Sequence, residues 1–342
     1  MPDNFSSNPR NLKNMKIAFF STQSYDRDYF NRFNTGYTYQ FFDVLLDENT
    51  AELARGNTVV CTFVNDRLTA PVLRILSANG VKLIALRCAG FNNLDLETAA
   101  ALGIKVVRVP AYSPHAVAEH AVALIMTLNR KTHKAYNRVR EGNFSLERLT
   151  GFDLYGKTVG IIGLGKIGEV FARIMRGFGC KVQVYDIVKN PEMENQGITY
   201  VSLEDLIKSS DIISLHCPLT DKTRYIIDPQ RIRQMKKGVM LINTGRGALI
   251  DTKAVMEGLK TGQIGYLGLD VYEQEETLFF RDLSENIIQD DTIMRLMSFP
   301  NVLITSHQAF FTDEALSQIA KITLKNISEF DSGSLLTNEV RE

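Results

Sequence analysis

The chain has 342 residues, more than a single hydrophobic core usually organises, so at least two domains are expected. Lys and Arg number 39, Asp and Glu also number 39, and the formal net charge is zero. This balance excludes the class of proteins that bind nucleic acid or anionic membranes through a basic surface. No apolar run approaches the ~18 residues of a membrane-spanning helix. We therefore expect a globular protein with neither a nucleic-acid nor a membrane partner.

The start of the chain and its cysteines bear on its location. Residues 1–14 are polar and lack the apolar core of a signal peptide, so we expect a tail there and a fold that begins near Met15. His115 and His120 do not share a helix face, so no metal site is predicted. The cysteines form no C-x-x-C pair and stand in apolar segments, which is typical of buried free thiols in a reducing cytoplasm. They are Cys61, Cys88, Cys180 and Cys217.

Strand-like and helix-like segments alternate over the first third of the chain. The apolar patterns predict strands at 16–20, 58–64, 82–87 and 105–107. Helices are predicted between them at 70–79 and 94–102. This alternation indicates an open α/β unit with a parallel sheet.

A long apolar helix is predicted after this first unit. Ser113 suits the N-cap, and Pro114 suits the first helical position. Residues 115–129 are apolar on nearly every face, which predicts a helix buried all round, either between domains or between subunits.

A second series of strands begins at Thr158. Its members are predicted at 158–162, 181–185, 212–216, 239–243, 266–270 and 302–305. The fold class that follows is α/β, with two doubly wound parallel-sheet domains of the Rossmann or flavodoxin-like kind. Ligands in such folds bind at the carboxyl ends of the strands.

The turn at residues 163–168 reads GLGKIG and lies between a predicted strand and a predicted amphipathic helix. In that context G-x-G-x-x-G indicates dinucleotide binding. Gly163 would make the tight turn, Gly165 would admit a pyrophosphate, and Gly168 would let the helix pack on the strand. Asp186 ends the next strand, 18 residues after Gly168, near the ~20 expected of an acid that binds the adenosine ribose. Its charge would repel a 2′-phosphate, so NAD is favoured over NADP.

Three further turns follow predicted strands in the second half of the chain. Arg246 stands between two glycines in NTGRG, where it could pair with a carboxylate through two hydrogen bonds. Asp270 ends a strand and precedes several acids in LDVYEQEE. His307 follows another strand in LITSHQAFF, a position that favours acid–base chemistry over a purely structural role.

Together these segments resemble the D-specific 2-hydroxyacid dehydrogenases. The resemblance rests on GLGKIG with Asp186, NTGRGALID, LDVYEQEE and SHQAFFTDEA, supported by RCAGFNNLD and VPAYSPHAVAEHA. It runs from about Met15 to Phe330. Tyr112 and Phe310 resemble the branch of that family that reduces pyruvate to D-lactate. The resemblance implies an NAD-dependent enzyme that acts on a small 2-keto or 2-hydroxy acid.

The resemblance also implies roles for individual residues. Arg246 matches the arginine that binds the substrate carboxylate, and His307 matches the acid/base histidine. Glu275 matches the glutamate that hydrogen-bonds this histidine and favours its imidazolium form. The choice of Glu275 over Glu273 and Glu276 rests on this match alone. Further substrate-binding positions are the amides of Ala89 and Gly90 and the pocket walls Tyr112 and Phe310. The implied cofactor-binding residues are Gly163, Gly165, Lys166, Ile167, Gly168, Asp186, Cys217, Pro218, Thr223, Thr244, Gly245, Arg246 and Asp270.

A domain arrangement follows from the same resemblance. Residues 1–111 and 310–342 would form the substrate domain, residues 112–309 the cofactor domain, and the active site would lie in the cleft between them. The helix after Ser113 would be the contact of a homodimer, or of a dimer of dimers. Two alternatives stay open: a D-2-hydroxyisocaproate-type dehydrogenase with a roomier pocket, and an NAD-sensing, corepressor-like interaction protein.

Overall fold

The computed structural model describes residues 15–341, and they divide into two compact units. The first unit consists of residues 15–113 and 312–341, and the second of residues 114–311. The sequence predicts that the chain passes from the first unit to the second between residues 111 and 112 and returns between residues 309 and 310. The tail expected at residues 1–14 lies outside the described residues.

A parallel sheet of five strands forms the centre of the first unit, in the order β2-β1-β3-β4-β5. Its strands are β1 (Lys16–Phe19), β2 (Thr38–Phe41), β3 (Val59–Thr62), β4 (Leu83–Leu86) and β5 (Lys105–Arg108). Every residue of β3 and β4 is buried, as expected of a parallel sheet covered on both faces. Chain order reverses between β1 and β3, so their carboxyl ends flank the topological switch point of this sheet.

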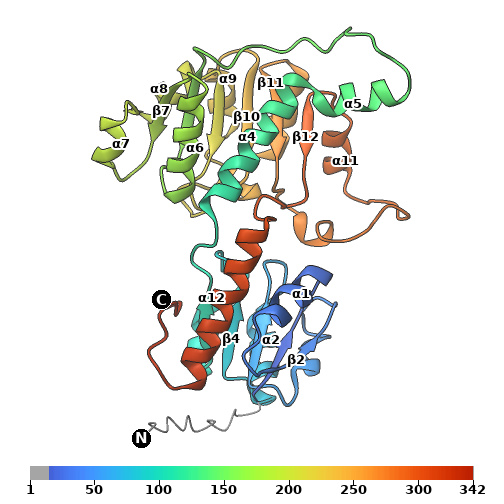
Figure 1. Ribbon diagram of the computed structural model, residues 1–342, viewed down its shortest axis with the longest axis vertical. Coiled ribbons are helices and arrows are strands. Elements are labelled where there is room, and N and C mark those ends of the chain that lie inside the picture. The colour runs from blue at the N-terminus through green and yellow to red at the C-terminus, as the bar shows by residue number, and fades with distance from the viewer. Residues whose placement is uncertain (1–14, 342) are drawn as a thin grey trace, which may run out of the picture. The chain divides into compact units, whose positions relative to one another are not determined.

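The helices of the first unit come from both ends of the chain. They are α1 (Ser24–Arg32), α2 (Ala70–Ala78), α3 (Leu96–Ala101), α12 (Asp313–Asp331) and the 3₁₀ helix η1 (Ala51–Ala54). Helix α12 packs on β4 and β5 (Figure 1). Its buried residues Ala320, Leu324 and Ile327 share a core with Phe19 and Phe30. This burial holds the C-terminal segment in the first unit, although the whole second unit separates the two in sequence.

A parallel sheet of seven strands forms the centre of the second unit, in the order β12-β11-β10-β9-β6-β7-β8. Its strands are β6 (Thr158–Ile162), β7 (Lys181–Tyr185), β8 (Thr199–Tyr200), β9 (Ile212–Leu215), β10 (Val239–Asn243), β11 (Ile264–Leu269) and β12 (Val302–Ile304). Chain order reverses between β6 and β9. Their carboxyl ends therefore flank the place where doubly wound sheets bind ligands.

Alternate residues of these strands feed two cores, one on each face of the sheet. Ile212 and Met240 belong to the core that includes α4 (Pro114–Arg130) and α6 (Lys166–Gly177). These two helices contact each other on one face of the sheet (Figure 1). Ile213 and Leu241 belong to the other core, with α8 (Leu203–Ser209), α9 (Pro229–Gln234), α10 (Thr252–Lys260) and α11 (Asp291–Met297). The remaining elements are α5 (Thr132–Arg140), α7 (Pro191–Asn195), η2 (Gly247–Leu249) and η3 (Glu275–Thr277).

The structure differs from the sequence-based expectation at three elements. Strands β2 and β8 are not among the predicted strands: β2 is a half-exposed edge strand, and β8 has only two residues. Within the single chain, helix α4 leaves His115, Glu119 and Ala123 exposed, so its predicted all-round burial would need a second subunit. Its other apolar side chains pack on α6 and on the sheet.

Candidate active site

The glycine turn between β6 and α6 has the geometry that a dinucleotide phosphate needs. Gly163 has a φ of +97°, and a Cβ on it would lie 2.5 Å from the backbone nitrogen of Cys217. A Cβ on Gly168 would lie 2.2 Å from the carbonyl oxygen of Gly163. By contrast, nothing lies within 4 Å of a Cβ on Gly165, which is the N-cap of α6. Two glycines thus permit close packing, and the third leaves space at the positive end of the helix, where phosphates bind.

Asp186, directly after β7, is oriented by the backbone around it. Its Oδ2 accepts a hydrogen bond from Leu164 N–H at 2.5 Å, and its Oδ1 accepts one from Val188 N–H at 2.8 Å. Each carboxylate oxygen keeps a lone pair for a further donor. Ile187 and Val188 beside it are 90% and 70% exposed. The residues present therefore fit a dinucleotide, with a fixed acceptor for ribose hydroxyls next to the glycine turn.

The other predicted residues of the second unit lie at the same edge of the sheet. Parallel strands bring their carboxyl ends together, so residues far apart in sequence become neighbours there. Cys217 and Pro218 follow β9, Thr244, Gly245 and Arg246 follow β10, Asp270 follows β11, and His307 and Phe310 follow β12.

Two predicted cofactor-binding threonines, Thr244 and Thr223, differ in the hydrogen bonds of their hydroxyl groups. Thr244 is buried, and its Oγ1 has no hydrogen-bond partner within the described residues. Buried polar atoms of this kind are normally satisfied by water or a ligand. Thr223 is instead engaged by its own loop: its Oγ1 donates to Pro218 O at 2.6 Å and accepts from Thr220 N–H at 2.8 Å. A direct contact of either side chain with the cofactor remains a prediction.

His216 is a neighbour of the glycine turn that the motif does not reveal. Its carbonyl carbon would lie 2.7 Å from a Cβ on Gly163. Its Nε2 lies 2.9 Å from Ser214 Oγ, and its ring centre lies 4.8 Å from that of Phe171. Burial lowers the pKa of His216 to about 3, so the ring is neutral at neutral pH. The turn is thus supported by an uncharged group; the only sequence signal is a histidine immediately after a buried strand.

Arg246 is held in a short turn between β10 and η2. Asn243 Nδ2 donates to Arg246 O at 2.8 Å, and Gly245 N–H donates to Asn243 Oδ1 at 3.0 Å. Arg246 Nη1 donates to Gly245 O at 2.8 Å. A Cβ on the next residue, Gly247, would lie 2.2 Å from the carbonyl carbon of Tyr272. Only glycine therefore lets the arginine turn lie directly against the segment that follows β11.

His307 is paired with Glu275 on that segment. His307 Nδ1 lies 2.8 Å from Glu275 Oε1, and the two side chains are 14% and 15% exposed. Glu275 Oε2 accepts from Tyr272 N–H at 2.9 Å, which fixes the carboxylate. His307 has a φ of +54°, and its N–H donates to Asp270 O at 2.7 Å. Because Glu275 engages Nδ1, the proton that His307 can exchange with a ligand is the one on Nε2.

The structure distinguishes the three glutamates that the sequence left open. Glu273 faces the other way: its Oε1 accepts from Tyr225 OH at 2.7 Å, and its Oε2 accepts from Thr252 N–H at 3.2 Å. The side chain of Glu276 is exposed. Glu275 is therefore the glutamate that contacts His307.

The predicted substrate residues Ala89, Gly90 and Tyr112 belong to the first unit, whereas Arg246 and His307 belong to the second. Ala89 and Gly90 follow β4 and are half-buried. Arg108 Nη1 donates to Ala89 O at 2.8 Å, and Cys88 Sγ donates to Gly90 O at 3.3 Å. The side chain of Phe310, in the second unit, is buried. The roles of these residues in substrate binding remain predictions.

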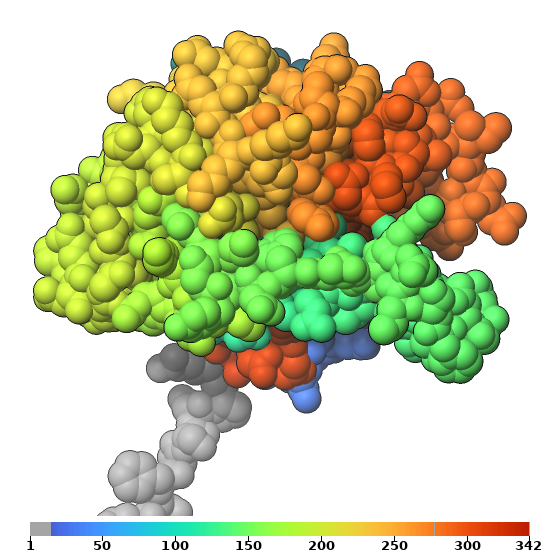
Figure 2. Space-filling view, turned by 90° about the horizontal axis from the view of Figure 1, so that it is seen from above, coloured from blue at the N-terminus to red at the C-terminus, as the bar shows by residue number. Residues whose placement is uncertain are grey.

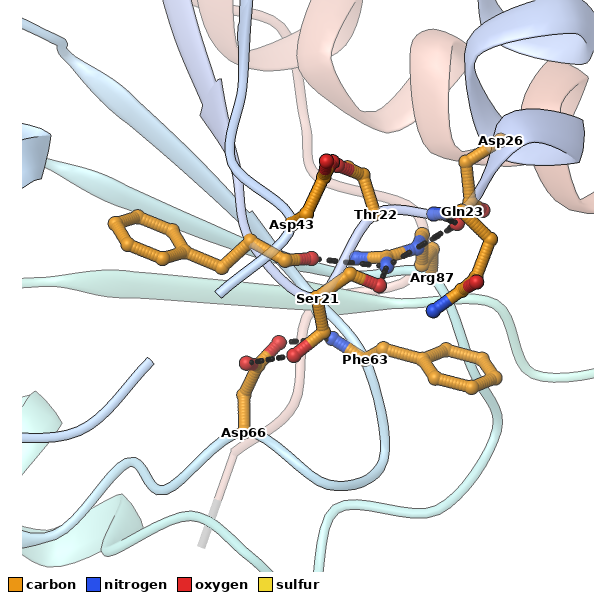
Figure 3. A network of polar contacts seen from close by, with 9 residues as sticks. Ser21, Thr22, Gln23, Asp26, Asp43, Phe63, Asp66 and Arg87 are labelled. Carbon is orange, nitrogen blue, oxygen red and sulfur yellow. Dashed lines mark hydrogen bonds and ion pairs between the residues drawn. The ribbon is translucent and has the colours of Figure 1, made fainter. Parts of the chain in front are cut away.

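A buried polar network lies at the carboxyl ends of β1, β3 and β4 in the first unit (Figure 3). Arg87 is 1% exposed; its Nη2 donates to Ser21 O at 2.8 Å, and its Nε donates to Asp26 Oδ1 at 3.2 Å. Asp66 accepts from Ser21 Oγ and from Phe63 N–H, both at 2.6 Å. Charged side chains of the protein, Arg87, Asp26 and Asp66, thus lie at this switch point. Their hydrogen bonds connect the loops that follow β1 and β3 to the turn that follows β4.

Residues 15–341 contain neither a metal-binding cluster nor a membrane-spanning helix. No three or more His, Cys, Asp or Glu side chains gather there in a way that could hold a metal ion. In the same part of the chain, no helix combines the length and the apolar character that crossing a membrane requires.

Comparison with known proteins places this geometry in one family. Residues 122–309 match the family model for the D-isomer specific 2-hydroxyacid dehydrogenase, NAD binding domain. A D-lactate dehydrogenase of Escherichia coli is 52% identical over 328 residues, which cover 95% of this chain and 100% of that protein. The apo-structure of D-lactate dehydrogenase from Escherichia coli matches with a TM-score of 0.88 at 50% identity, covering 96% of this chain and 100% of that one. The D-lactate dehydrogenase of Aquifex aeolicus complexed with NAD and lactic acid matches with a TM-score of 0.84 at 35% identity, covering 95% of this chain and 98% of that one.

The chain belongs to the D-isomer specific 2-hydroxyacid dehydrogenase family. It is an NAD-dependent oxidoreductase, and the matched segment lies within the second unit. The predicted fold class of two parallel-sheet α/β domains, the predicted family and the predicted cofactor are confirmed.

Proposed function

We propose that this protein is a D-lactate dehydrogenase, which reduces pyruvate to D-lactate with NADH and catalyses the reverse reaction. The observation that carries the proposal is the pairing of His307 with Glu275 at the carboxyl ends of the strands in the second unit. His307 follows β12 and Arg246 follows β10, and β11 lies between these two strands. The D-lactate dehydrogenases at about half identity over nearly the whole chain support the choice of substrate.

Arg246, His307 and Glu275 have different roles in the proposed reaction. The nicotinamide, when bound, supplies the hydride for the keto carbon. Arg246 pairs with the substrate carboxylate and polarises the adjacent carbonyl. His307 donates its Nε2 proton to the carbonyl oxygen as negative charge develops there. Glu275 holds the imidazole by Nδ1 and stabilises its charged form until that proton is given up.

Turnover of NADH with pyruvate tests the proposal. We expect NADH oxidation that depends on pyruvate, and a product that is D-lactate by an enantioselective assay. Absence of turnover with pyruvate and with larger 2-keto acids would contradict the enzymatic proposal and favour an NAD-sensing interaction protein. A higher kcat/KM for 2-ketoisocaproate than for pyruvate would instead identify a D-2-hydroxyisocaproate-type enzyme.

Asp186 is expected to set the preference for NADH over NADPH. Replacing it by Asn removes the charge that repels a 2′-phosphate and weakens the hold on the ribose hydroxyls. One lost charged hydrogen bond corresponds to roughly a ten- to hundredfold effect. We therefore expect Asp186→Asn to lower the NADH/NADPH ratio of kcat/KM by about that factor, measured with pyruvate as the second substrate.

Asp211→Asn is the matched control for this prediction. Asp211 also accepts a backbone hydrogen bond, from Thr158 N–H at 2.8 Å, but it precedes β9 and so lies at the opposite edge of the sheet. Its substitution should leave the NADH/NADPH ratio unchanged. An unchanged ratio in Asp186→Asn as well would show that this aspartate does not contact the ribose.

We also propose that the protein is a homodimer in the cytoplasm. Helix α5 has no buried residue, and α5 and the segment after it, green in Figure 2, expose large apolar side chains. Tyr136 is 61%, Phe144 75% and Leu146 81% exposed. This apolar surface is adjacent in sequence to α4, the helix predicted to form the dimer contact. Light scattering should give twice the chain mass, or four times for a dimer of dimers.

The free state of all four cysteines supports a reducing compartment.

A further inference from the structure

A second histidine, His120, lies close to the loop that carries His307 and takes no part in the proposed proton transfer. His120 is on helix α4, and its Nε2 lies 3.0 Å from Thr305 Oγ1 and 3.4 Å from Asp270 Oδ1. Its side chain is 16% exposed, while that of Asp270 is fully buried. The three residues come from three separate elements of the second unit: α4, the end of β11 and the end of β12.

The hydrogen-bond direction within this group follows from the number of protons available. Thr305 Oγ1 lies 2.6 Å from Asp270 Oδ1, and a carboxylate can only accept, so the single hydroxyl proton of Thr305 points to Asp270. Thr305 Oγ1 must then accept from His120, which places a proton on Nε2 of that ring. The result is a relay in which His120 donates to Thr305 and Thr305 donates to Asp270.

Asp270 also accepts hydrogen bonds from the backbone around His307. Its Oδ1 accepts from Gln308 N–H and its Oδ2 from Ala309 N–H, both at 2.8 Å. Its own carbonyl oxygen accepts from His307 N–H at 2.7 Å. Burial alone would raise the pKa of Asp270, but the proximity of His120 and the hydrogen bonds from Thr305 and Ala309 outweigh it and hold the pKa below its usual value. The ionised carboxylate of Asp270 is thus hydrogen-bonded to Thr305, before His307, and to Gln308, after it, and His307 itself has a positive φ.

We propose that His120 and Thr305 are positioning residues for the acid/base histidine: through Asp270 they hold the backbone of residues 307–309 and so set where His307 presents Nε2. The proposal rests on the proposed function, because it assumes that His307 transfers the proton. Glu275 controls the orientation of the imidazole ring, whereas the relay controls the position of the backbone that carries it. A loop without the relay would let His307 leave its left-handed conformation, which non-glycine residues rarely adopt unless the surroundings impose it.

Four variants separate this role from general stability. His120→Leu removes the donor, and His120→Gln retains an N–H at nearly the same distance from the backbone. Thr305→Val removes the hydroxyl while keeping the shape, and the fourth variant combines His120→Leu with Thr305→Val. A misplaced catalytic group can cost up to about a hundredfold. We expect His120→Leu and Thr305→Val each to lower kcat by about ten- to a hundredfold, with the Kd for NADH unchanged. The double variant should be no slower than the slower single variant, and His120→Gln should recover most of the activity.

His115→Leu is the matched control, since His115 is an exposed histidine on the same helix. It should match the parent protein in kcat. If losses in the two single variants simply multiply, or if they follow a weaker NADH affinity and a lower Tm, the relay is wrong and His120 is only a packing residue. Unchanged kcat in His120→Leu, in a protein where His307→Ala is inactive, would likewise overturn the relay alone.

The tautomer of His120 tests the relay without any turnover. The ¹⁵N spectrum of histidine-labelled protein, with the His120 signals identified by their loss in His120→Gln, should show a protonated Nε2. A neutral ring protonated only at Nδ1 would contradict the proposal. Because this measurement needs no substrate, its result stands even if the protein turns over no 2-keto acid, an outcome that would count against the proposed function instead.

Discussion

The His307→Ala variant is expected to lose about 10²–10⁴-fold in kcat, the range that a positioned general acid contributes. In the proposed mechanism the proton for the substrate carbonyl comes from Nε2, since Glu275 engages Nδ1 at 2.8 Å. The glycine turn lies between β6 and α6, Asp186 directly follows β7, and the Asp186 carboxylate is hydrogen-bonded to Leu164 and Val188 and not to His307. The Kd for NADH, measured by fluorescence titration, should therefore stay close to that of the parent protein while kcat falls.

His115→Ala serves as the control for the loss of a histidine as such, and it should retain the parent kcat. Parent-like turnover in His307→Ala would remove His307 from the mechanism. A loss of NADH affinity that parallels the loss of kcat would show that the substitution disturbs the cofactor edge, so that kcat does not report on proton transfer alone.

The Arg246→Lys variant is expected to lose about ten- to a hundredfold in kcat/KM for pyruvate, because one charge-assisted pair contributes ~1.5–3 kcal/mol. Lysine keeps the charge but cannot reproduce the planar, bidentate contact of a guanidinium with a carboxylate. In the proposed mechanism Arg246 also polarises the carbonyl that is reduced, so it would act in the transition state as well as in binding. We therefore expect kcat to fall and KM to rise together, in steady-state measurements at saturating NADH.

Oxamate inhibition provides an independent measurement for Arg246, because oxamate carries the same carboxylate as pyruvate and is not reduced. Its inhibition constant should rise in parallel with KM. Arg231→Lys is the matched control, since Arg231 on α9 forms its ion pair with Asp228, the N-cap of that helix, at 2.8 Å. Unchanged pyruvate kinetics together with unchanged oxamate inhibition in Arg246→Lys would show that the carboxylate is held elsewhere, most simply by the amides of Ala89 and Gly90.

Local chemistry along the chain was sufficient to predict the fold class and the cofactor. Apolar runs of strand length alternate with helical patterns, and this alternation alone specifies parallel α/β units. The glycine turn is equally local, since Gly163, Gly165 and Gly168 act within one strand–turn–helix segment. Asp186 could be predicted as the ribose acceptor because it directly follows the very next strand. Strands β2 and β8 escaped prediction because an exposed edge strand and a two-residue strand carry little apolar signal.

The tertiary structure decided what depends on contacts between distant residues. Glu273, Glu275 and Glu276 are chemically alike in the sequence, and only the path of the chain after β11 places Glu275 on His307. His120 and Thr305 are 185 residues apart, so no local pattern could pair them. Likewise, residues 312–341 belong to the first unit because α12 buries its apolar side chains there. In each case side chains with the same local preferences acquire different roles, because packing of the parallel sheet brings only some of them together.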